Sequence, residues 1–157
     1  MNKTVKESQV IMHELILPND TNNLDTVFGG KVMQYMDLCA AMSAYKFART
    51  AVVTASVDRL DFLAPARVGD MLILKSSVNY YHNTSMEIGV RIDAENVKTG
   101  KIRHTASAYL TFVSLDKSGK PQELSHKIIP ESDDEKRRYN EGKERHIERI
   151  ERLKDKR

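Results

Sequence analysis

One acidic side chain stands alone in an apolar stretch and is the first candidate for chemistry. Between Lys31 and Lys46 the only charged residue is Asp37, and Met, Leu and Ala dominate the residues around it. A carboxylate that loses water on burial favours its neutral form, and beside a cleft it can act as a base or a nucleophile. A buried Asp that accepts hydrogen bonds from backbone amides of a neighbouring strand explains these residues equally well, so both interpretations stay open.

A glycine pair, Gly29 and Gly30, precedes this stretch. If a helix begins there, its first N–H groups are unpaired and lie at the positive end of the helix dipole. Glycine lets a ligand oxygen approach such amides closely, which stabilises an oxyanion during attack on an acyl carbon. Taken alone, a Gly-Gly pair is explained better by a tight turn. Asp37 follows Gly30 by about two helical turns, so the two lie on nearly the same side of a helix.

The elements that must position these residues follow from the apolar pattern. Good helix formers predict a helix over residues 32–48, after a polar loop around Asn22. Apolar or small residues on nearly every face predict that other structure wraps this helix. Strands are predicted over residues 9–17, 51–63, 71–81, 86–94 and 102–115. Short turns between the later strands favour antiparallel pairing, so the sequence predicts an α+β fold in which a curved antiparallel sheet wraps one long central helix.

The C-terminal segment, residues 130–157, is denser in charge than the rest of the chain. Ser132 and Glu135 form a helix-start signature. A thin apolar stripe at helical spacing follows, made of Tyr139, His146, Ile147, Ile150 and Leu153. We expect a mostly solvated helical tail that packs on the body or on a neighbouring subunit. A solubilising appendage is the simpler interpretation, and assembly of dimers into a larger ring is the alternative.

Composition excludes several classes of protein. The chain has 157 residues, 40% of them apolar, and a net charge of +3 that is too small to indicate nucleic-acid binding. A single cysteine, Cys39, excludes an internal disulfide and a cysteine-rich zinc site, and the five histidines show no metal-ligand spacing. Neither a bilayer-spanning stretch nor the apolar core of a signal peptide is present. We therefore expect a cytoplasmic protein with no nucleic-acid, membrane or metal partner.

Several short motifs occur in a characteristic order. They are Pro18-x-Asp20-Thr21-Asn22, Phe28-Gly29-Gly30, Met36-Asp37, Val53-Thr54, Phe62-x-x-Pro65 and Val68-Gly69-Asp70. In this order they resemble the hotdog-fold acyl-CoA thioesterases, and are similar to the cytosolic bacterial acyl-CoA hydrolases and the brain-type cytosolic acyl-CoA hydrolase. The resemblance covers about residues 8–120. Asp25 departs from it, at or beside a position where many relatives have glycine.

The resemblance implies a hotdog domain over residues 8–120, followed by the charged helix expected from composition over residues 130–157. It implies dimers with active sites at the subunit interface, often assembled as a trimer of dimers. The implied activity is hydrolysis of acyl-CoA to a free fatty acid and coenzyme A. No cofactor is implied, because coenzyme A is part of the substrate and product.

Site residues are carried over by motif. Asp37 would be the catalytic acid residue, acting as base or nucleophile, and Asn22 would be its partner from the facing subunit. The amide near Gly30 would polarise the thioester carbonyl. The substrate-binding candidates are Gly29, Arg59, Thr84 and Ser85. A solvated edge charge is the alternative for the arginine, and a plain hairpin turn is the alternative for the Thr-Ser pair.

Two other functions are compatible with such a fold. A non-catalytic acyl-CoA-binding sensor would need a DNA-binding module, which neither the short N-terminal segment nor the mixed-charge tail resembles. A hotdog dehydratase or hydratase commonly uses a histidine beside an acid, and no histidine lies between residues 18 and 81. The thioesterase is therefore the favoured interpretation.

Overall fold

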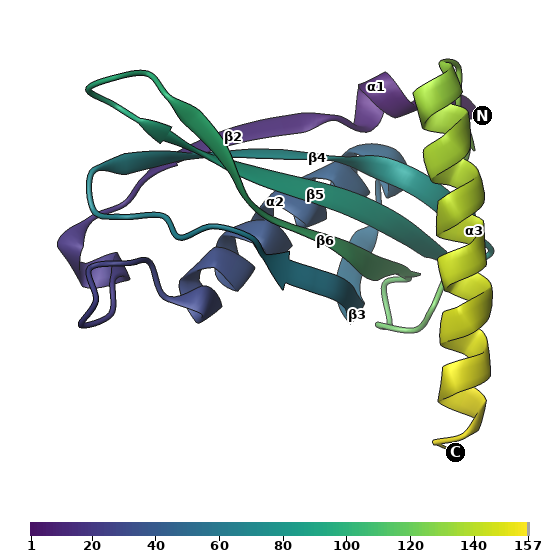
Figure 1. Cartoon of the computed structure of the whole chain (residues 1–157). Coiled ribbons are helices and arrows are strands. Elements are labelled where there is room, and N and C mark those ends of the chain that lie inside the picture. The colour runs from purple at the N-terminus through teal and green to yellow at the C-terminus, as the bar shows by residue number, and fades with distance from the viewer. Residues whose placement is uncertain (157) are drawn as a thin grey trace.

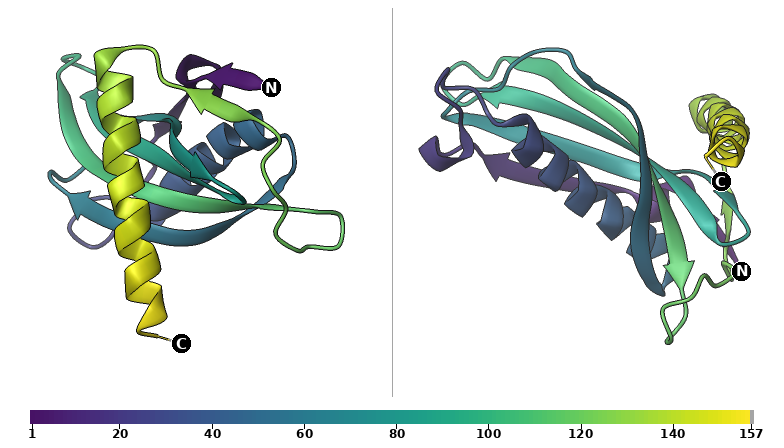
Figure 2. Two further views of the ribbon diagram at one scale, coloured as in Figure 1. Left: turned by 90° about the vertical axis from the view of Figure 1, so that its right-hand side faces the viewer. Right: turned by 90° about the horizontal axis from the view of Figure 1, so that it is seen from below.

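The computed structural model describes residues 1–156. Its elements are β1 (Asn2–Thr4), α1 (Val5–Ser8), β2 (Val10–Leu15), the 3-10 helix η1 (Pro18–Asp20), α2 (Gly29–Ala48), β3 (Ala51–Phe62), β4 (Asp70–His82), β5 (Ser85–Asn96), β6 (Ile102–Leu115), β7 (Lys127–Ile129) and α3 (Asp133–Lys154). Five strands form one antiparallel sheet in the order β2-β4-β5-β6-β3, and β1 pairs in parallel with β7. The sheet curves around α2, while α3 crosses its other face near one end (Figures 1 and 2). This confirms the expected α+β hotdog architecture.

Helix α2 begins at Gly29, three residues earlier than predicted. The side that packs on the sheet is made of Val32, Met36, Cys39, Ala40, Ser43, Ala44, Phe47 and Ala48, all buried. The opposite side, which carries Asp37, stays exposed in a single chain. The prediction that other structure covers every face of this helix is therefore wrong within one subunit, because the sheet covers one side only.

The strands agree with the alternation read from the sequence, and β6 has the predicted bounds of residues 102–115. Inward-facing side chains of the central strands fill the core against α2, among them Leu72, Ile88, Ile92 and Phe112. Burying each such side chain stabilises the fold by about 1.5–3 kcal/mol. Strand β3 lies at one edge of the sheet. Since β6 is its only partner strand among the described residues, the outer row of backbone N–H and C=O groups of β3 is free to meet another strand.

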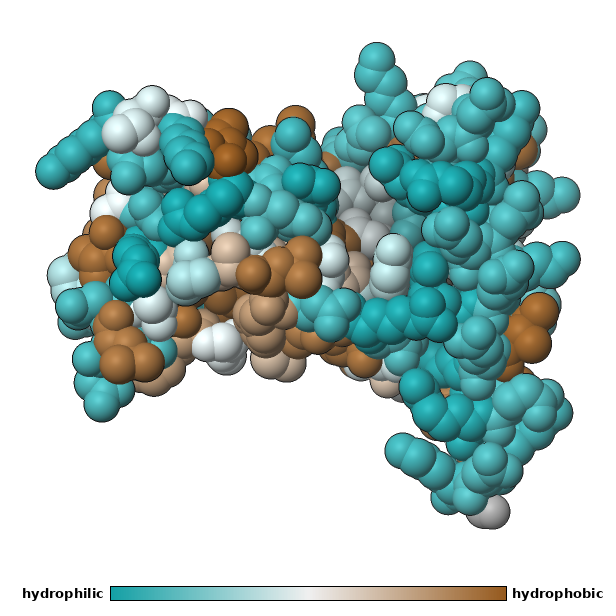
Figure 3. All heavy atoms as spheres, viewed as in Figure 1, coloured by the Kyte–Doolittle hydropathy of each residue, from teal (hydrophilic) through white to brown (hydrophobic). Residues whose placement is uncertain are grey.

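Helix α3 packs on the sheet through part of the predicted stripe and through three further residues. Gly142, Arg145 and Arg149 are its buried residues, and the predicted Tyr139 and His146 contact the ring of Tyr80. Ile147 is 53% exposed and Ile150 38%, so these two do not pack on the body within one chain, and their packing on a neighbouring subunit stays a prediction. Arginine stems cover apolar surface while their charges pair, and here they replace the aliphatic residues. Hydrophilic residues dominate the outer surface of this helix (Figure 3).

Within residues 1–156, no helix has both the length and the apolar character that crossing a bilayer requires. The same residues contain no group of three or more His, Cys, Asp or Glu side chains able to hold a metal ion.

Gly142 sets the distance between α3 and the sheet. A Cβ at this position would lie 2.9 Å from Cβ of Tyr80 and 3.1 Å from Oε1 of Glu87. Alanine normally favours a helix interior over glycine by about 1 kcal/mol. Here we expect Gly142→Ala to lower the free energy of unfolding by about 1–3 kcal/mol, because the added methyl group pushes the helix away from the sheet. Urea unfolding measures this.

The matched control is Asn140→Ala, at an exposed position of the same helix. It should be neutral or slightly stabilising, because alanine is the better helix former. A gain in stability at both positions would contradict the close approach of α3 to the sheet.

Candidate active site

Asp37 meets strand β3 on the exposed side of α2. The hydroxyl of Thr54 donates a hydrogen bond to Oδ1 of Asp37 at 2.5 Å. Thr54 can reach the helix because it lies opposite Phe112, whose side chain is in the core on the same side of the sheet. The carboxylate is exposed, and its partner is a hydroxyl rather than the backbone amides of a neighbouring strand. Its second oxygen has no hydrogen-bond partner within residues 1–156.

The surface around Asp37 is apolar although one chain leaves it uncovered. Met33 is 43% exposed and Leu38 51%, both within one turn of Asp37 on α2, and Val57 of β3 is 43% exposed. Such a patch beside a free strand edge is typical of a surface that another protein molecule covers.

Gly29 and Gly30 form the first turn of α2, as the glycine pair suggested. Neither is capped by a side chain, since the N-cap residue is Phe28. A Cβ on Gly30 would meet no atom within 4 Å, so a ligand oxygen has room there. Their N–H groups lie at the positive end of the helix dipole, which suits a developing negative charge.

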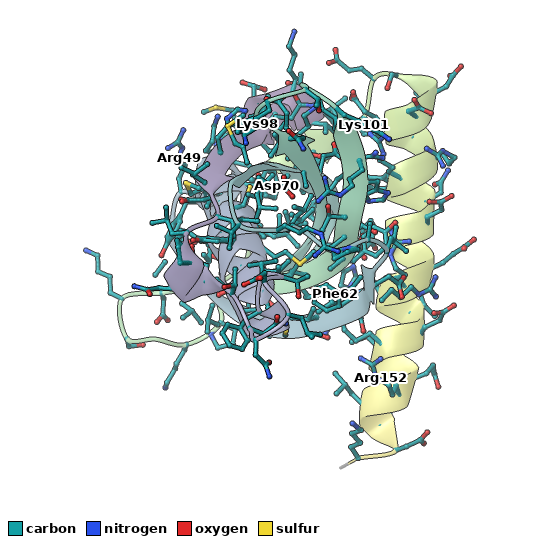
Figure 4. The ribbon with its side chains drawn as sticks, turned by 60° about the vertical axis from the view of Figure 1, so that its left-hand side comes forward. Arg49, Phe62, Asp70, Lys98, Lys101 and Arg152 are labelled. Carbon is teal, nitrogen blue, oxygen red and sulfur yellow. The ribbon has the colours of Figure 1, made fainter. Side chains whose placement is uncertain are left out.

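A cavity of about 310 Å³ opens beside this helix end. Its lining is mostly apolar and includes Gly29, Val32, Phe62, Leu63 and Ala66. Figure 4 brings this end of the molecule forward, with Phe62 labelled.

An ion pair holds the loop that forms one wall of this cavity. Nη2 of Arg103 contacts Oδ2 of Asp70 at 2.5 Å and donates to the Pro65 carbonyl at 2.9 Å. The same Asp70 oxygen accepts from the backbone of Arg67 at 2.9 Å. The shape of this wall is therefore fixed by charge-assisted hydrogen bonds.

Asn22 lies in the polar loop before α2 and is half-buried. Its Oδ1 accepts from the backbone of Leu24 at 2.9 Å and from the hydroxyl of Thr26 at 3.1 Å. Because the oxygen is engaged in the loop, the Nδ2 amide is the donor that remains for a ligand. Asp25 has a φ of 59°, in the left-handed region that favours glycine. This explains why many relatives have glycine at or beside this position, and Asp is one of the few other residues that adopt this conformation readily. No hydrogen bond joins Asn22 to Asp37 within the described chain.

The other three candidates lie away from Asp37. Nη2 of Arg59 pairs with Oε2 of Glu148 on α3 at 2.9 Å. Ser85 donates from Oγ to the His82 carbonyl at 3.2 Å, in the turn between β4 and β5 that Thr84 shares. The structure does not bring these residues to the Asp37 carboxylate, and their role in substrate binding stays a prediction.

Reasoning from residue types missed Thr54. Threonine is an ordinary strand residue, so only its inward position could have marked it. Within an alternating strand, a hydroxyl on the core side needs a partner, and the only acidic residue of the facing helix supplies it. Val53-Thr54 belongs to the ordered set of motifs, but residue type alone predicts no role for it.

Comparisons with known proteins agree with this geometry. The sequence profile described as the thioesterase superfamily matches residues 24–101. An uncharacterized acyl-CoA thioester hydrolase of Bacillus subtilis, YkhA, is 40% identical over 144 residues, which are 92% of this chain and 83% of that protein. The cytosolic acyl coenzyme A thioester hydrolase of Mus musculus is 37% identical over 92% of this chain, which spans only 38% of that longer protein.

Solved structures match over nearly the whole chain. An apo-hexameric acyl-CoA thioesterase has a TM-score of 0.92 and 43% identity, covering 97% of both chains. The acyl-CoA hydrolase of Staphylococcus aureus, solved with butyryl coenzyme A and coenzyme A, has a TM-score of 0.91 and 38% identity, covering 99% of this chain and 94% of that one. That hydrolase has also been solved with alanine in place of an aspartate, of an asparagine and of a threonine. The chain therefore belongs to the thioesterase superfamily, among its hotdog-fold acyl-CoA hydrolases.

Proposed function

We propose that this protein hydrolyses the thioester of acyl-CoA to a free fatty acid and coenzyme A, at a site that Asp37 of one subunit and Asn22 of another build together. One observation carries the proposal. The asparagine, aspartate and threonine replaced in the Staphylococcus aureus hydrolase are 15 and 17 residues apart in chain order. Asn22, Asp37 and Thr54 have the same spacing here, and the last two are in contact.

The two oxygens of the Asp37 carboxylate would have different roles in the reaction. Thr54 holds one oxygen of Asp37, which leaves the other free to face the substrate. As a general base, Asp37 takes a proton from water while the water oxygen attacks the acyl carbon and the coenzyme A thiolate leaves. As a nucleophile, it attacks the acyl carbon itself, expels the thiolate, and water then hydrolyses the mixed anhydride. In both cases the Gly30 amide would stabilise the oxyanion.

A second copy of the chain completes the site in this proposal. The exposed apolar side chains around Asp37 and the free edge of β3 support a dimer across this edge. The Nδ2 group of Asn22, free of the loop, would then be presented to the substrate from the facing subunit. The hexameric neighbour supports a trimer of dimers, and the relative named as cytosolic supports a cytoplasmic location.

The apolar and polar parts of the substrate would bind at different places on the protein. The apolar cavity beside Gly29 suits an alkyl or pantetheine segment close to the helix end. Arg59, Thr84 and Ser85 remain the candidates for the polar half. Both the guanidinium and the hydroxyls lie on the α3 side, so they would act on substrate held by a different subunit.

A thiol-release assay across short, medium and long acyl-CoAs tests the function. We expect steady turnover for at least one chain length, by protein whose mass in light scattering shows an oligomer. Calorimetric binding of acyl-CoA without any thiol release would instead support the non-catalytic sensor. Absence of both binding and turnover would contradict the proposal as a whole.

Thr54→Val should lower kcat about 10- to 100-fold. Valine has nearly the same shape, so the substitution removes the hydrogen bond to Asp37 and little else. A hydrogen bond to a charged group contributes about 1.5–3 kcal/mol, which corresponds to this factor if the bond positions the carboxylate in the transition state. Thr54→Ser keeps the hydroxyl and should retain most of the activity. Full activity in the valine variant would show that Thr54 does not position Asp37 for the reaction.

A further inference from the structure

Phe62 lies at the opening of the cavity beside the start of α2. It is 51% exposed, whereas Val32, Ala66 and Thr105, which line the same cavity, are each at most 2% exposed. A Cβ on Gly29 would lie 3.6 Å from Cζ of Phe62, so the ring reaches the first turn of α2 (Figure 4). The Phe62 ring therefore borders both the cavity and the helix start, where no side chain caps α2.

A β-bulge turns Phe62 toward this cavity. In a regular strand, residues four apart lie on the same face of the sheet. Asp58 lies on the outer face, where it contacts α3, yet Phe62 pairs with Ala106, whose side chain is in the core. The register of β3 against β6 shifts just after Asp58, and Arg59, within this shift, has a left-handed φ of 51°. Such a φ is uncommon for a residue other than glycine, and bulges beside active sites often re-aim a side chain.

Polar groups of the cavity wall are already hydrogen-bonded within the chain. The backbone N–H groups of Leu63 and Ala64 donate to the Thr105 carbonyl at 2.7 and 3.3 Å. The Thr26 hydroxyl donates to the polar loop before α2 at 3.1 Å. The pantetheine arm of coenzyme A carries amides and a hydroxyl, which need hydrogen-bond partners when they leave water, whereas an alkyl chain needs none. The cavity therefore suits an alkyl chain better than the pantetheine arm.

We propose that this cavity buries the acyl chain of the thioester substrate, and that Phe62, at its opening, limits how many carbons it buries. The inference rests on the proposed function and adds the residue that selects among acyl chains. With the thioester carbonyl at the amides of Gly29 and Gly30, the chain has the cavity directly beside it. The volume of about 310 Å³ is at the low end for small-molecule sites, so the space that the Phe62 ring fills decides which chains are buried completely.

The dependence of kcat/KM on chain length tests this role. Each methylene group that becomes buried raises kcat/KM about fourfold. For straight-chain substrates from butyryl-CoA to myristoyl-CoA, kcat/KM should therefore rise and then level off once the cavity is full. Phe62→Ala should move this limit to chains at least two carbons longer, and Phe62→Trp should move it to shorter chains. Two carbons beyond the wild-type limit, the alanine variant should exceed the wild type about tenfold in kcat/KM.

Val97→Ala, in the turn between β5 and β6, is the control, because Val97 is 54% exposed and does not line the cavity. It should keep the wild-type limit. A limit that stays at the same chain length in both Phe62 variants overturns the proposal, and so does a loss in Phe62→Ala that is equal at every chain length. Absence of turnover for every acyl-CoA in the wild type would instead contradict the proposed hydrolysis.

A crystal structure tests the same site without turnover. The full-length protein would be crystallised with an S-(2-oxoalkyl)-coenzyme A of medium chain length, a ketone in which no thioester bond can be hydrolysed. Its alkyl chain should lie in the cavity, between Phe62 and Val32. A pantetheine arm in the cavity, or an alkyl chain bound elsewhere, overturns the proposal.

Discussion

Asp37→Asn is expected to lower kcat for acyl-CoA hydrolysis by about 10³-fold or more. An amide of the same shape neither accepts a proton at neutral pH nor attacks a thioester carbonyl, and general base catalysis alone contributes about 10²–10⁴-fold. The Asn Oδ1 can still accept the hydrogen bond from Thr54, so the contact between α2 and β3 is kept. The measurement is steady-state thiol release, with light scattering and circular dichroism to show that assembly and fold are unchanged.

A matched control distinguishes the loss of the reacting carboxylate from a mere change in net charge. Glu123→Gln removes one carboxylate at an exposed loop position far from α2 in the sequence, and should leave kcat and KM unchanged. Asp37→Asn should change kcat much more than KM, because the lost interaction acts on the transition state. More than a tenth of wild-type turnover in the asparagine variant would show that Asp37 is not the group that performs the reaction.

Periodicity was enough to predict the architecture of the sheet and its central helix. Alternation of apolar and polar residues predicts a strand, and β6 has the predicted bounds of residues 102–115. The coverage of α2 was misjudged for a physical reason. Apolar residues such as Met33 and Leu38 look the same in a sequence whether the chain's own sheet or a second copy covers them. A single chain therefore leaves exposed the face on which the proposed site depends.

Residue type singled out Asp37 and Gly30, because a lone charge in an apolar helix and a glycine at a helix start are both unusual. The partners of charged side chains could not be predicted from residue type in the same way. Arg59 pairs with Glu148, 89 residues later in the chain, and nothing in the sequence near either residue indicates this contact. The tail was expected to be mostly solvated, yet its Arg145 is buried against Glu87. Such partners depend on where α3 crosses the sheet, and local sequence carries no signal of that crossing.

The buried pair between Arg145 and Glu87 should be the largest single contribution of α3 to stability. Both side chains are 8% exposed, and two hydrogen bonds at 2.8 and 2.9 Å join them. The guanidinium also stacks on Tyr109, with its carbon 3.6 Å from the ring centre. Removing one partner leaves the other as an unpaired buried charge, which destabilises the fold by about 3–5 kcal/mol. We therefore expect Glu87→Gln or Arg145→Met to lower the free energy of unfolding by this amount, measured in urea.

The double variant shows whether the loss of stability comes from breaking the ion pair or from the separate contacts of each residue. In Glu87→Gln/Arg145→Met neither charge is left alone, so the loss should be clearly smaller than the sum of the single losses. The exposed pair between β3 and the same helix, Arg59 with Glu148, is the control, because both its side chains are more than half exposed. Arg59→Met should cost at most about 1 kcal/mol, since water screens the pair. Equal losses at the buried and exposed pairs, or single losses that simply add, would show that α3 is held by its stacking contacts and not by this charge pair.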